Sequence, residues 1–405
     1  MSLERADVAV IGAGIIGAGI ASRLSRDGLD VVVIDPAPGR GSSLGNAGLI
    51  VPSYSTPMST PGNLWEGIKT FGSQHAPVTF AKPLGFESLK FLASFAMNCR
   101  PGRVKRDTAK LHGLATLSQK RYQQLREDGL DLGMQEQGWL WLSTDEGNAE
   151  RLHADAERMR AAGATCDVVN REQIVDLQAG VEDGVASGIW FSNEGFLDPE
   201  EAARRWLQDA IDHGAQVVGA KVIDHEATGS NLHTLITDSG RVSARHVVLA
   251  TGASSRETGK ALGVSVPVEP GYGWSVTLED QDRLVSRALM GMEDHVVISP
   301  MPGRVRITGG MRFGGMSNAV PADSDISALR QGAEALLPEL RHLPELSRWQ
   351  GARPMTASGV PIIGQRKYEN LTVAAGHGPL GVTLAPVTVD KVHEIVEHSL
   401  AASRA

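Results

Sequence analysis

Arg353 is the residue whose chemistry is hardest to explain by packing alone. It lies in segment 351–364, GARPMTASGVPIIG, where a proline follows it and glycines mark a turn. A guanidinium stays charged at any accessible pH, so a packed position costs free energy unless an anion meets it. The partner of Arg353 is therefore either a carboxylate of the protein or a bound anion.

A glycine-rich motif near the start of the chain has the spacing of a dinucleotide-binding turn. Gly12, Gly14 and Gly17 form G-x-G-x-x-G between the apolar stretch ADVAVI and the helix-like stretch AGIASRLSRDG. The first glycine permits a tight turn, the second lets the backbone approach a pyrophosphate, and the third lets helix and strand pack closely. The anion would then rest on the N-terminus of the helix.

Asp35 supports the same interpretation. It ends the second apolar strand, LDVVVIDP, and at this position an acid can hydrogen-bond the adenosine ribose. Strand, helix, second strand and terminal acid together predict a dinucleotide site. The alternative is a glycine-rich packing turn in which Asp35 caps a helix before Pro36.

The elements that must position these residues alternate between helix and strand. We expect mostly helix over 64–128, a helix at 199–214, strands from 215 to 252, an antiparallel set over 264–310 and a C-terminal helix from about 379. The late strand HVVLATGAS, at 246–254, indicates that the chain leaves the sheet after the second strand and returns to it much later. A simple nicotinamide dehydrogenase uses one contiguous doubly wound domain, so this split favours a flavin.

Composition and charge exclude several classes of protein. A chain of 405 residues suits one large domain or two ordinary ones. A net charge of −8, spread along the chain, argues against nucleic-acid binding, which requires a concentrated basic face. Cys99 and Cys166 form no paired motif and the histidines are scattered, so neither a disulfide framework nor a metal site is expected. The longest apolar run, 8–21, is too short to span a bilayer, and we expect a cytoplasmic protein, or one on the inner face of a membrane.

Five segments of the sequence resemble those of a known family. The segments VIGAGIIG, GSSLGNAGLIVPSY (41–54), VLATGA, GARPMTASGVPIIG and AAGHGPLGVTLAP (374–386) are similar to those of the D-amino-acid oxidase (DAO) superfamily of flavoproteins, and within it to bacterial D-amino-acid dehydrogenases. The resemblance covers nearly the whole chain. One departure is Ser358, where the family often has an aspartate.

The resemblance implies an α/β fold of the glutathione-reductase-2 type. A split doubly wound, Rossmann-like FAD-binding domain would comprise 1–80, 150–260 and 345–405. An antiparallel-sheet substrate domain would comprise 81–149 and 261–344 and roof the flavin. FAD would be bound non-covalently, since neither cysteine falls in the C-terminal flavin segments.

The resemblance also implies the residues that bind FAD. Segment 378–383 would bring a helix N-terminus to the pyrimidine end of the flavin, which carries negative charge when reduced. The full implied set is Gly12, Gly14, Ile15, Ile16, Gly17, Asp35, Ser42, Ser43, Asn46, Ala47, Gly48, Val222, Thr251, Gly252, Gly378, Pro379, Leu380, Gly381, Val382 and Thr383.

For the substrate, the resemblance places Arg353 on the amino-acid carboxylate, where a planar guanidinium can bind both oxygens. An internal salt bridge is the alternative. Tyr272 is the expected companion or else a half-buried strand aromatic, and Trp274 and Tyr54 are weaker pocket candidates. Arg312 could reach the site or serve on the surface. No protein base is implied for C–H cleavage, so His377 is expected to pack beside the flavin.

The implied activity is oxidative deamination of a D-amino acid to a 2-oxo acid through the imine, with electrons passed to a quinone or another acceptor. D-proline or hydroxy-D-proline dehydrogenation and an oxygen-using glycine or sarcosine oxidase remain alternatives. A third is an FAD-binding subunit without turnover. Segment 83–106 joins apolar residues to a basic tail and could touch an anionic membrane, but an ordinary helix packed on the flavin domain is favoured there.

Overall fold

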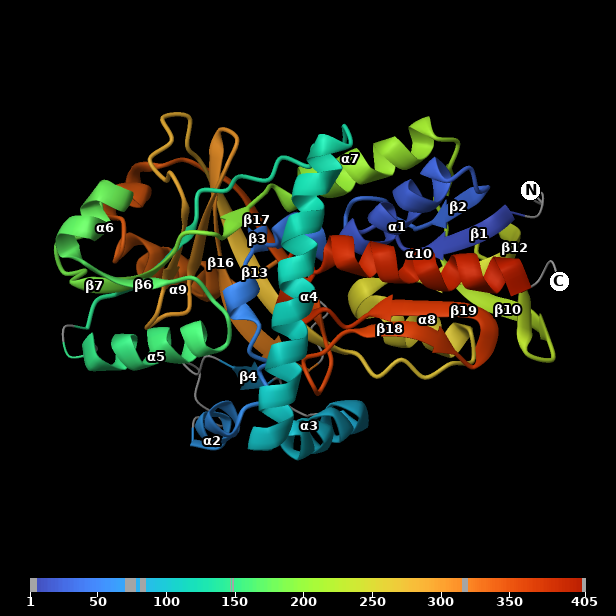
Figure 1. The fold of residues 1–405 in the computed structure, drawn as a ribbon, viewed down its shortest axis with the longest axis horizontal. Coiled ribbons are helices and arrows are strands. Elements are labelled where there is room, and N and C mark those ends of the chain that lie inside the picture. Colours follow the sequence, from blue (N-terminus) through green and yellow to red (C-terminus); the bar gives the residue numbers. More distant parts are fainter. Residues whose placement is uncertain are drawn as a thin grey trace.

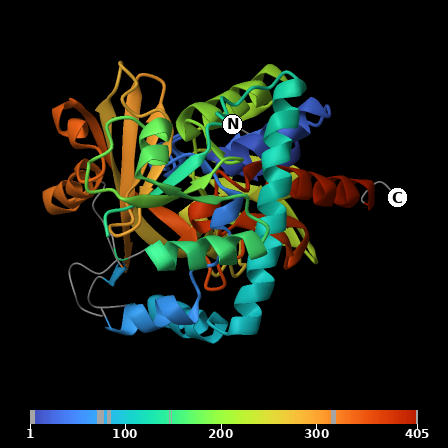
Figure 2. The ribbon, with the colours of Figure 1, turned by 60° about the vertical axis from the view of Figure 1, so that its left-hand side comes forward.

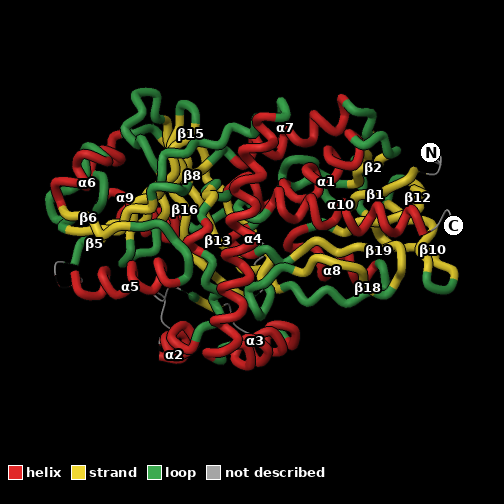
Figure 3. Tube along the Cα trace, viewed as in Figure 1, coloured by secondary structure: helices red, strands yellow, loops and turns green. Residues whose placement is uncertain are grey.

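The computed structural model describes residues 6–69, 78–80, 85–145, 147, 149–314 and 320–402. Two sheets lie side by side along the long axis of the molecule, and both termini are at the end formed by the first sheet (Figure 1). Both halves contain helices as well as strands (Figure 3). None of the described helices is long and apolar enough to cross a bilayer.

The first sheet contains the glycine-rich turn. Its centre is a parallel array in the order β9, β2, β1, β12, β19, and β18 pairs antiparallel with β19. The ribbon of β10 and β11 extends the N-terminal part of β12. These strands are β1 (Ala6–Ile11), β2 (Val31–Ile34), β9 (Gln216–Val218), β10 (Val222–Thr228), β11 (Asn231–Thr237), β12 (Gly240–Leu249), β18 (Ile362–Arg366) and β19 (Tyr368–Ala375). The strand run and the late return to the sheet are confirmed.

Three helices cover one face of this sheet. They are α1 (Ile15–Arg26), α7 (Pro199–Asp212) and α10 (Ala385–Ala402). Trp206 on α7 is almost fully buried and lies against Gly19 of α1. The opposite face packs on the β10–β11 ribbon and on the segment around α8 (Ser255–Ala261). The central strands are therefore buried on both faces, which explains their nearly continuous runs of valine and isoleucine.

The second sheet has nine strands in the order β17, β13, β16, β15, β14, β5, β7, β6, with the short β4 beside β16. Helix α9 (Asp323–Glu334) packs on β13 and β16, while α5 (Ala149–Ala161) and α6 (Arg171–Leu177) pack near β6 and β7. The strands are β4 (Thr79–Phe80), β5 (Trp139–Ser143), β6 (Asp167–Asn170), β7 (Ser187–Phe191), β13 (Glu269–Glu279), β14 (Ala288–Gly291), β15 (Val297–Met301), β16 (Arg304–Phe313) and β17 (Glu345–Met355).

Sheet membership differs from the expected domain boundaries. Strands β6 and β7 fall in 150–260, and β17 falls in 345–405, yet all three belong to the second sheet. The sequence does not reveal this, because a short apolar strand carries no mark of the sheet it will join. We propose that 150–198 and 345–356 be assigned to the substrate half.

The helical region expected over 64–128 is confirmed for the residues that the structure describes. It consists of α2 (Pro61–Lys69), α3 (Phe86–Asn98) and α4 (Pro101–Glu127). Helix α4 crosses the molecule between the two sheets, while α2 and α3 project from its lower end in two views (Figures 1 and 2). The Tyr122 hydroxyl on α4 donates to the Val382 carbonyl at 2.8 Å. Pro83 and Leu84, at the start of the expected membrane-contact segment, lie outside the described residues.

His246 should make the stability of the first sheet depend on pH. Its imidazole is buried on β12, with Nδ1 and Nε2 each 2.9 Å from the hydroxyls of Ser399 and Thr372. Burial lowers the pKa of His246 to about 4, against roughly 6.5 in an unfolded chain. Between these values the unfolded chain binds more protons, so the free energy of unfolding should fall by up to about 3 kcal/mol as the pH drops through this window.

Thermal unfolding at a series of pH values measures this effect. His246→Gln should flatten the pH dependence between about pH 6.5 and pH 4. The control is His398→Gln, at an exposed position on α10, which should keep the slope of the parent protein. Equal slopes for the parent and His246→Gln would contradict the assignment.

Candidate active site

A large cavity of about 1540 Å³ lies where the loops of the two sheets meet. Single ligands usually occupy about 300–1,000 Å³, so there is room for a cofactor and a substrate together. The cavity is lined by most of the predicted cofactor residues, namely Gly12, Gly14, Ile15, Ile16, Asp35, Ser42, Ser43, Asn46, Ala47, Val222, Thr251, Gly252, Gly378, Pro379, Leu380, Gly381 and Val382. The structure thus brings together segments from both ends of the chain.

The three motif glycines have different steric reasons to be glycine. Gly12 has φ +107°, and a Cβ there would lie 2.5 Å from the Ala250 carbonyl oxygen. A Cβ on Gly17 would clash with the Gly12 carbonyl. At Gly14 the nearest atom to such a Cβ is Ser43 Oγ, at 3.8 Å, and the space beyond belongs to the cavity. Gly12 and Gly17 therefore close the turn, whereas Gly14 leaves room for a ligand, and Gly17 does not line the cavity.

The N-terminus of α1 is suited to an anion. Gly14 is its N-cap, with no side-chain cap, and the first turn has no acidic residue. The positive end of the helix dipole thus faces the cavity. Asp35 lies beside it, where Oδ2 accepts the Ala13 N–H at 2.7 Å and Oδ1 accepts the Ala37 N–H at 2.8 Å. The residues present fit a pyrophosphate next to a ribose.

Loop 42–48 joins the two sheets at this site. It starts with the 3-10 helix Ser42–Gly45, and Ser42 Oγ donates to the Ala352 carbonyl on β17 at 2.6 Å. Arg306 on β16 is buried and donates from Nη1 to the Asn46 carbonyl at 3.2 Å. Burial lowers the pKa of Arg306 to about 10, which leaves it charged at neutral pH. Sequence reasoning missed Arg306, because nothing in its local pattern marks it as buried.

The C-terminal side of the cavity differs from the expected helix start. Segment 378–380 forms a single 3-10 turn, and α10 begins only at Ala385. Gly376 and Gly378 have φ of +81° and +55°, so the chain bends sharply before the turn. Thr383 does not line the cavity. Its Oγ1 donates to the Leu49 carbonyl at 2.9 Å, which ties this segment to the loop after Asn46.

Gly48 and Ser358 also have structural explanations. Gly48 has φ +74°, and a Cβ there would clash with the Leu197 carbonyl, so it shapes the loop without lining the cavity. Ser358 stands where the family often has aspartate, and its Oγ accepts the Val360 N–H at 3.2 Å. A hydroxyl at this position therefore completes the turn in place of a carboxylate.

His377 lines the cavity as a buried, neutral imidazole. Its Nε2 lies 3.0 Å from Thr388 Oγ1, and that hydroxyl donates to the Leu384 carbonyl at 2.8 Å. Since the hydroxyl proton is already engaged, Nε2 carries the proton of the imidazole and donates it to Thr388. Burial lowers the pKa of His377 to about 4. These contacts agree with the expected packing role.

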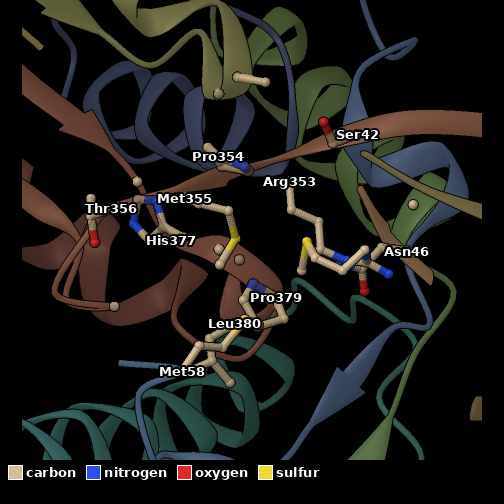
Figure 4. A pocket seen from close by; sticks show the side chains of 18 of the residues that line it. Ser42, Asn46, Met58, Arg353, Pro354, Met355, Thr356, His377, Pro379 and Leu380 are labelled. Atoms are coloured by element: carbon tan, nitrogen blue, oxygen red, sulfur yellow. The ribbon is translucent and has the colours of Figure 1, made fainter. Parts of the chain in front are cut away.

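Arg353 projects from β17 into the cavity, toward Asn46 (Figure 4). Its Nη1 donates to the Gly310 carbonyl at 2.6 Å. The guanidinium lies over Gly273, where any side chain would clash with it. Among the described residues no carboxylate comes within salt-bridge distance of Arg353. Burial lowers the pKa of Arg353, so a bound anion would stabilise the charged form of its side chain.

Tyr54 and Trp274 line the same cavity, but Tyr272 does not. Tyr54 stands edge-on to Trp139 and Trp141. The pKa of its hydroxyl is raised by burial and lowered, to a smaller extent, by the charge of Arg353. Trp274 contributes its ring at the edge of the cavity and otherwise belongs to the core of the second sheet.

Tyr272 is not among the residues that line the cavity, and the alternation of side chains along β13 agrees with this. The missing side-chain positions of Gly271 and Gly273 face Met355 and Arg353. Successive side chains of a strand point to opposite faces, so Tyr272 points away from the cavity. On that other face Arg312 forms an ion pair with Asp325 of α9 at 2.9 Å, and Arg312 does not line the cavity either.

Glu194 is a second residue that sequence reasoning missed. It is buried, and Oε1 accepts the N–H of Ser53, the neighbour of Tyr54, at 2.6 Å. Burial raises its pKa to about 8, so the acid is mostly neutral at pH 7. It holds the 3-10 helix Pro52–Tyr54 that carries Tyr54 to the cavity. In the sequence it looks like an ordinary polar turn residue, in SNEGF.

Comparison with known proteins gives the family. The family model described as "FAD dependent oxidoreductase", DAO, matches residues 7–392. The chain belongs to the DAO family of FAD-dependent oxidoreductases. FAD is therefore its cofactor, and the resemblance seen in the sequence is confirmed.

Relatives and solved structures agree. The chain is 28% identical to a D-amino acid dehydrogenase of Rhizorhabdus wittichii over 387 residues, 93% of each chain. It is 28% identical to a D-amino acid dehydrogenase of Bradyrhizobium diazoefficiens over 392 residues, 93% of this chain and 92% of that protein. The structure matches glycine oxidase from Geobacillus kaustophilus with a TM-score of 0.76 and 23% identity, over 98% of this chain and 95% of that one. The expected fold class is thereby confirmed.

Asp35→Ala should weaken FAD binding by roughly 10- to 150-fold, because hydrogen bonds to a charged acceptor contribute about 1.5–3 kcal/mol. The loss combines the predicted ribose contact with the observed support of the Ala13 N–H. Titration of apoprotein with FAD, followed by flavin fluorescence, measures the affinity. Asp30→Ala is the control, since Asp30 is exposed at the opposite end of β2. Unchanged affinity in Asp35→Ala would refute the assignment.

Proposed function

We propose that this protein is an FAD-dependent dehydrogenase that oxidises a D-amino acid to an imine, which water hydrolyses to a 2-oxo acid and ammonia. One observation carries the proposal. Arg353 places a partly buried guanidinium in the wall of a cavity lined by the predicted FAD residues, with no protein carboxylate within salt-bridge distance among the described residues. A carboxylate on the substrate would supply the missing anion.

FAD, when bound, supplies the acceptor for a hydride. We assign its pyrophosphate to the N-terminus of α1 and its ribose to Asp35, because these groups fit an anion and a diol. Loop 42–48 and segment 378–382 would contact the flavin. Neither cysteine lines the cavity, which supports non-covalent binding.

The residues of this chain would bind and orient the amino acid. Arg353 holds the carboxylate in two-pronged fashion, which fixes Cα relative to the cofactor. The Tyr54 hydroxyl lies near Arg353 and is placed to contact the same carboxylate. Trp139 and Trp141 line the cavity beside Tyr54 and would exclude water from the substrate. His377 donates its Nε2 proton to Thr388 and titrates far below neutral pH, so we assign it no proton transfer.

The preference for a D-amino acid rests on relatives that bear this name and align with nearly the whole chain. A cyclic substrate such as D-proline or a hydroxy-D-proline remains the nearest alternative, and a glycine or sarcosine oxidase the next. The open cavity beside Arg353 favours turnover over an FAD-binding subunit without activity. For the electron acceptor we propose a quinone.

Anaerobic mixing with a panel of D- and L-amino acids tests the function. We expect D-amino acids, or D-proline analogues, to bleach the flavin, and L-amino acids to leave it oxidised. Admission of air should then restore the yellow colour slowly, as a dehydrogenase requires. Fast reoxidation would identify an oxidase, and no bleaching by any member of the panel would favour the binding subunit.

Arg353→Ala should spare FAD binding and cripple amino-acid oxidation. Truncating one partner of a buried charge pair costs about 2–5 kcal/mol, so kcat/KM should fall by roughly 30- to several-thousand-fold. Arg353→Lys should recover only part of this, since an ammonium lacks the two-pronged geometry. Stopped-flow flavin reduction with the amino acid and with its amide measures the effect, and the amide should lose far less.

Arg312→Ala is the matched control. Arg312 lies on the neighbouring part of the same sheet but is paired with Asp325 on the other face. Its removal should leave the ratio of rates for the acid and the amide unchanged. If Arg353→Ala slows both substrates equally, Arg353 has only a structural role and the carboxylate is bound elsewhere.

A further inference from the structure

Helix α3 is apolar on two opposite faces. Its inner face packs Phe91 and Phe95 toward Phe313 of β16. Its outer face exposes Phe86, Leu89 and Met97 at helical spacing, and Phe86 is 70% exposed. A helix that is apolar all round is normally covered on both sides, so the outer face of α3 is fitted to a partner.

Helix α2 extends this surface. None of its residues is buried, and Trp65, which is 60% exposed, and Ile68 lie close to one turn apart. Both helices project together from the lower end of the molecule in two views (Figures 1 and 2). We name the group formed by Trp65, Ile68, Phe86, Leu89 and Met97 the α2–α3 face. Single exposed apolar residues are ordinary, but a cluster of large ones indicates a binding surface.

The charges around the α2–α3 face favour an anionic partner. Lys69 lies over the Trp65 ring at 5.4 Å and Lys90 over the Phe86 ring at 4.4 Å. Exposed basic residues continue into the start of α4, and over 86–106 Glu87 is the one acid against five basic residues, namely Lys90, Arg100, Arg103, Lys105 and Arg106. The chain as a whole carries −8, so this basic character is local.

We propose that the α2–α3 face docks on an anionic lipid bilayer. Its aromatic and aliphatic side chains would enter the boundary between headgroups and acyl chains, and the lysine ammonium groups would remain at the phosphates. Basic residues near the surface add to the attraction for anionic lipid. A bilayer fits this surface because basic side chains outnumber acidic ones: over 61–69 and 86–106 six basic residues stand against Glu66 and Glu87.

The same helices form one end of the cavity. Leu64 of α2 and Phe91, Leu92 and Phe95 of α3 line it, together with Asn63 and Glu66 of α2. A docked molecule would therefore place this end of the cavity over the membrane. This arrangement also rests on the proposed function, for it would let a membrane-dissolved quinone reach the cofactor without crossing water.

A buried polar contact holds α3 in place. Ser88 Oγ donates to Glu269 Oε1 at 2.6 Å, and Arg256 pairs with the same carboxylate at 2.6 Å. Glu269 is the first residue of β13, the strand that also carries Gly273 beneath Arg353. The outer face of α3 is thus presented by a helix anchored to the sheet of the active site.

Flotation of the FAD-loaded full chain with lipid vesicles tests the proposal. Binding is expected to vesicles that contain phosphatidylglycerol, to weaken with added salt, and to be slight on pure phosphatidylcholine. The triple variant Phe86→Ser, Leu89→Ser, Met97→Ser should lower the partition coefficient by roughly tenfold or more, since each buried apolar side chain contributes to insertion. Lys90→Glu with Arg103→Glu should weaken binding to anionic vesicles only.

The matched control is Ile223→Ser, Val320→Ser, Leu346→Ser, which removes three similarly exposed apolar side chains elsewhere. It should bind vesicles as the parent does. Both triple variants should keep the FAD content and the thermal midpoint of the parent, because the replaced side chains are exposed.

Three outcomes would overturn the proposal. The first is that the parent protein does not float with anionic vesicles. The second is that the Phe86, Leu89, Met97 variant floats as well as the parent does. The third is that the parent sediments as a dimer and this variant as a monomer. The last would identify a second copy of the chain as the occupant. Bleaching of the flavin by amino acids in solution is measured separately, so its failure would remove the proposed function while leaving the docking result intact.

Discussion

A partly buried guanidinium, with no carboxylate partner in the part of the chain that the structure describes, is the constraint on which this active site depends. Arg353 has one hydrogen bond to the Gly310 carbonyl and lies flat over Gly273. Leaving such a charge in a low-dielectric wall is costly, so the fold must hold it firmly and leave space for an anion. Pairing of β13 with β17 sets Gly271 opposite Arg353 and puts Gly273 under the guanidinium. The glycines of EPGYGWSV are therefore explained by the arginine that they accommodate.

A hydrogen bond links loop 42–48 to the segment of Arg353. Ser42 Oγ donates to the carbonyl of Ala352, the residue immediately before Arg353. From the other side, the charged Arg306 binds the Asn46 carbonyl, and Thr383 ties the C-terminal segment to Leu49. Each contact joins a loop of the first sheet to the second sheet or to the C-terminus. Displacement of loop 42–48 would thus move the predicted flavin contacts and the substrate contact together, which keeps donor and acceptor in register.

The sequence predicts the first sheet well and the second poorly, for physical reasons. A glycine motif constrains its own backbone, so Gly12, Gly14 and Gly17 could be assigned by spacing alone. The sheet to which β6 or β17 belongs depends on partners far along the chain. Tyr272 was misplaced because the face of a strand is set by its register, and the sequence around it gives no register. Arg306 and Glu194 differ from ordinary polar residues only in being buried. A local pattern of charged and polar residues does not reveal burial.

The cavity wall changes character from one end to the other. At the N-terminus of α1 it presents glycine backbone, hydroxyls and a helix dipole, which suit phosphates. In the middle, Arg353 supplies a single charge beside aromatic rings. At α2 and α3 it is formed mostly by leucine, isoleucine and phenylalanine, with Asn63 and Glu66 of α2 among them. Because burying a phosphate against apolar side chains is costly, the two ends of this one cavity differ in the chemical groups that they can accept.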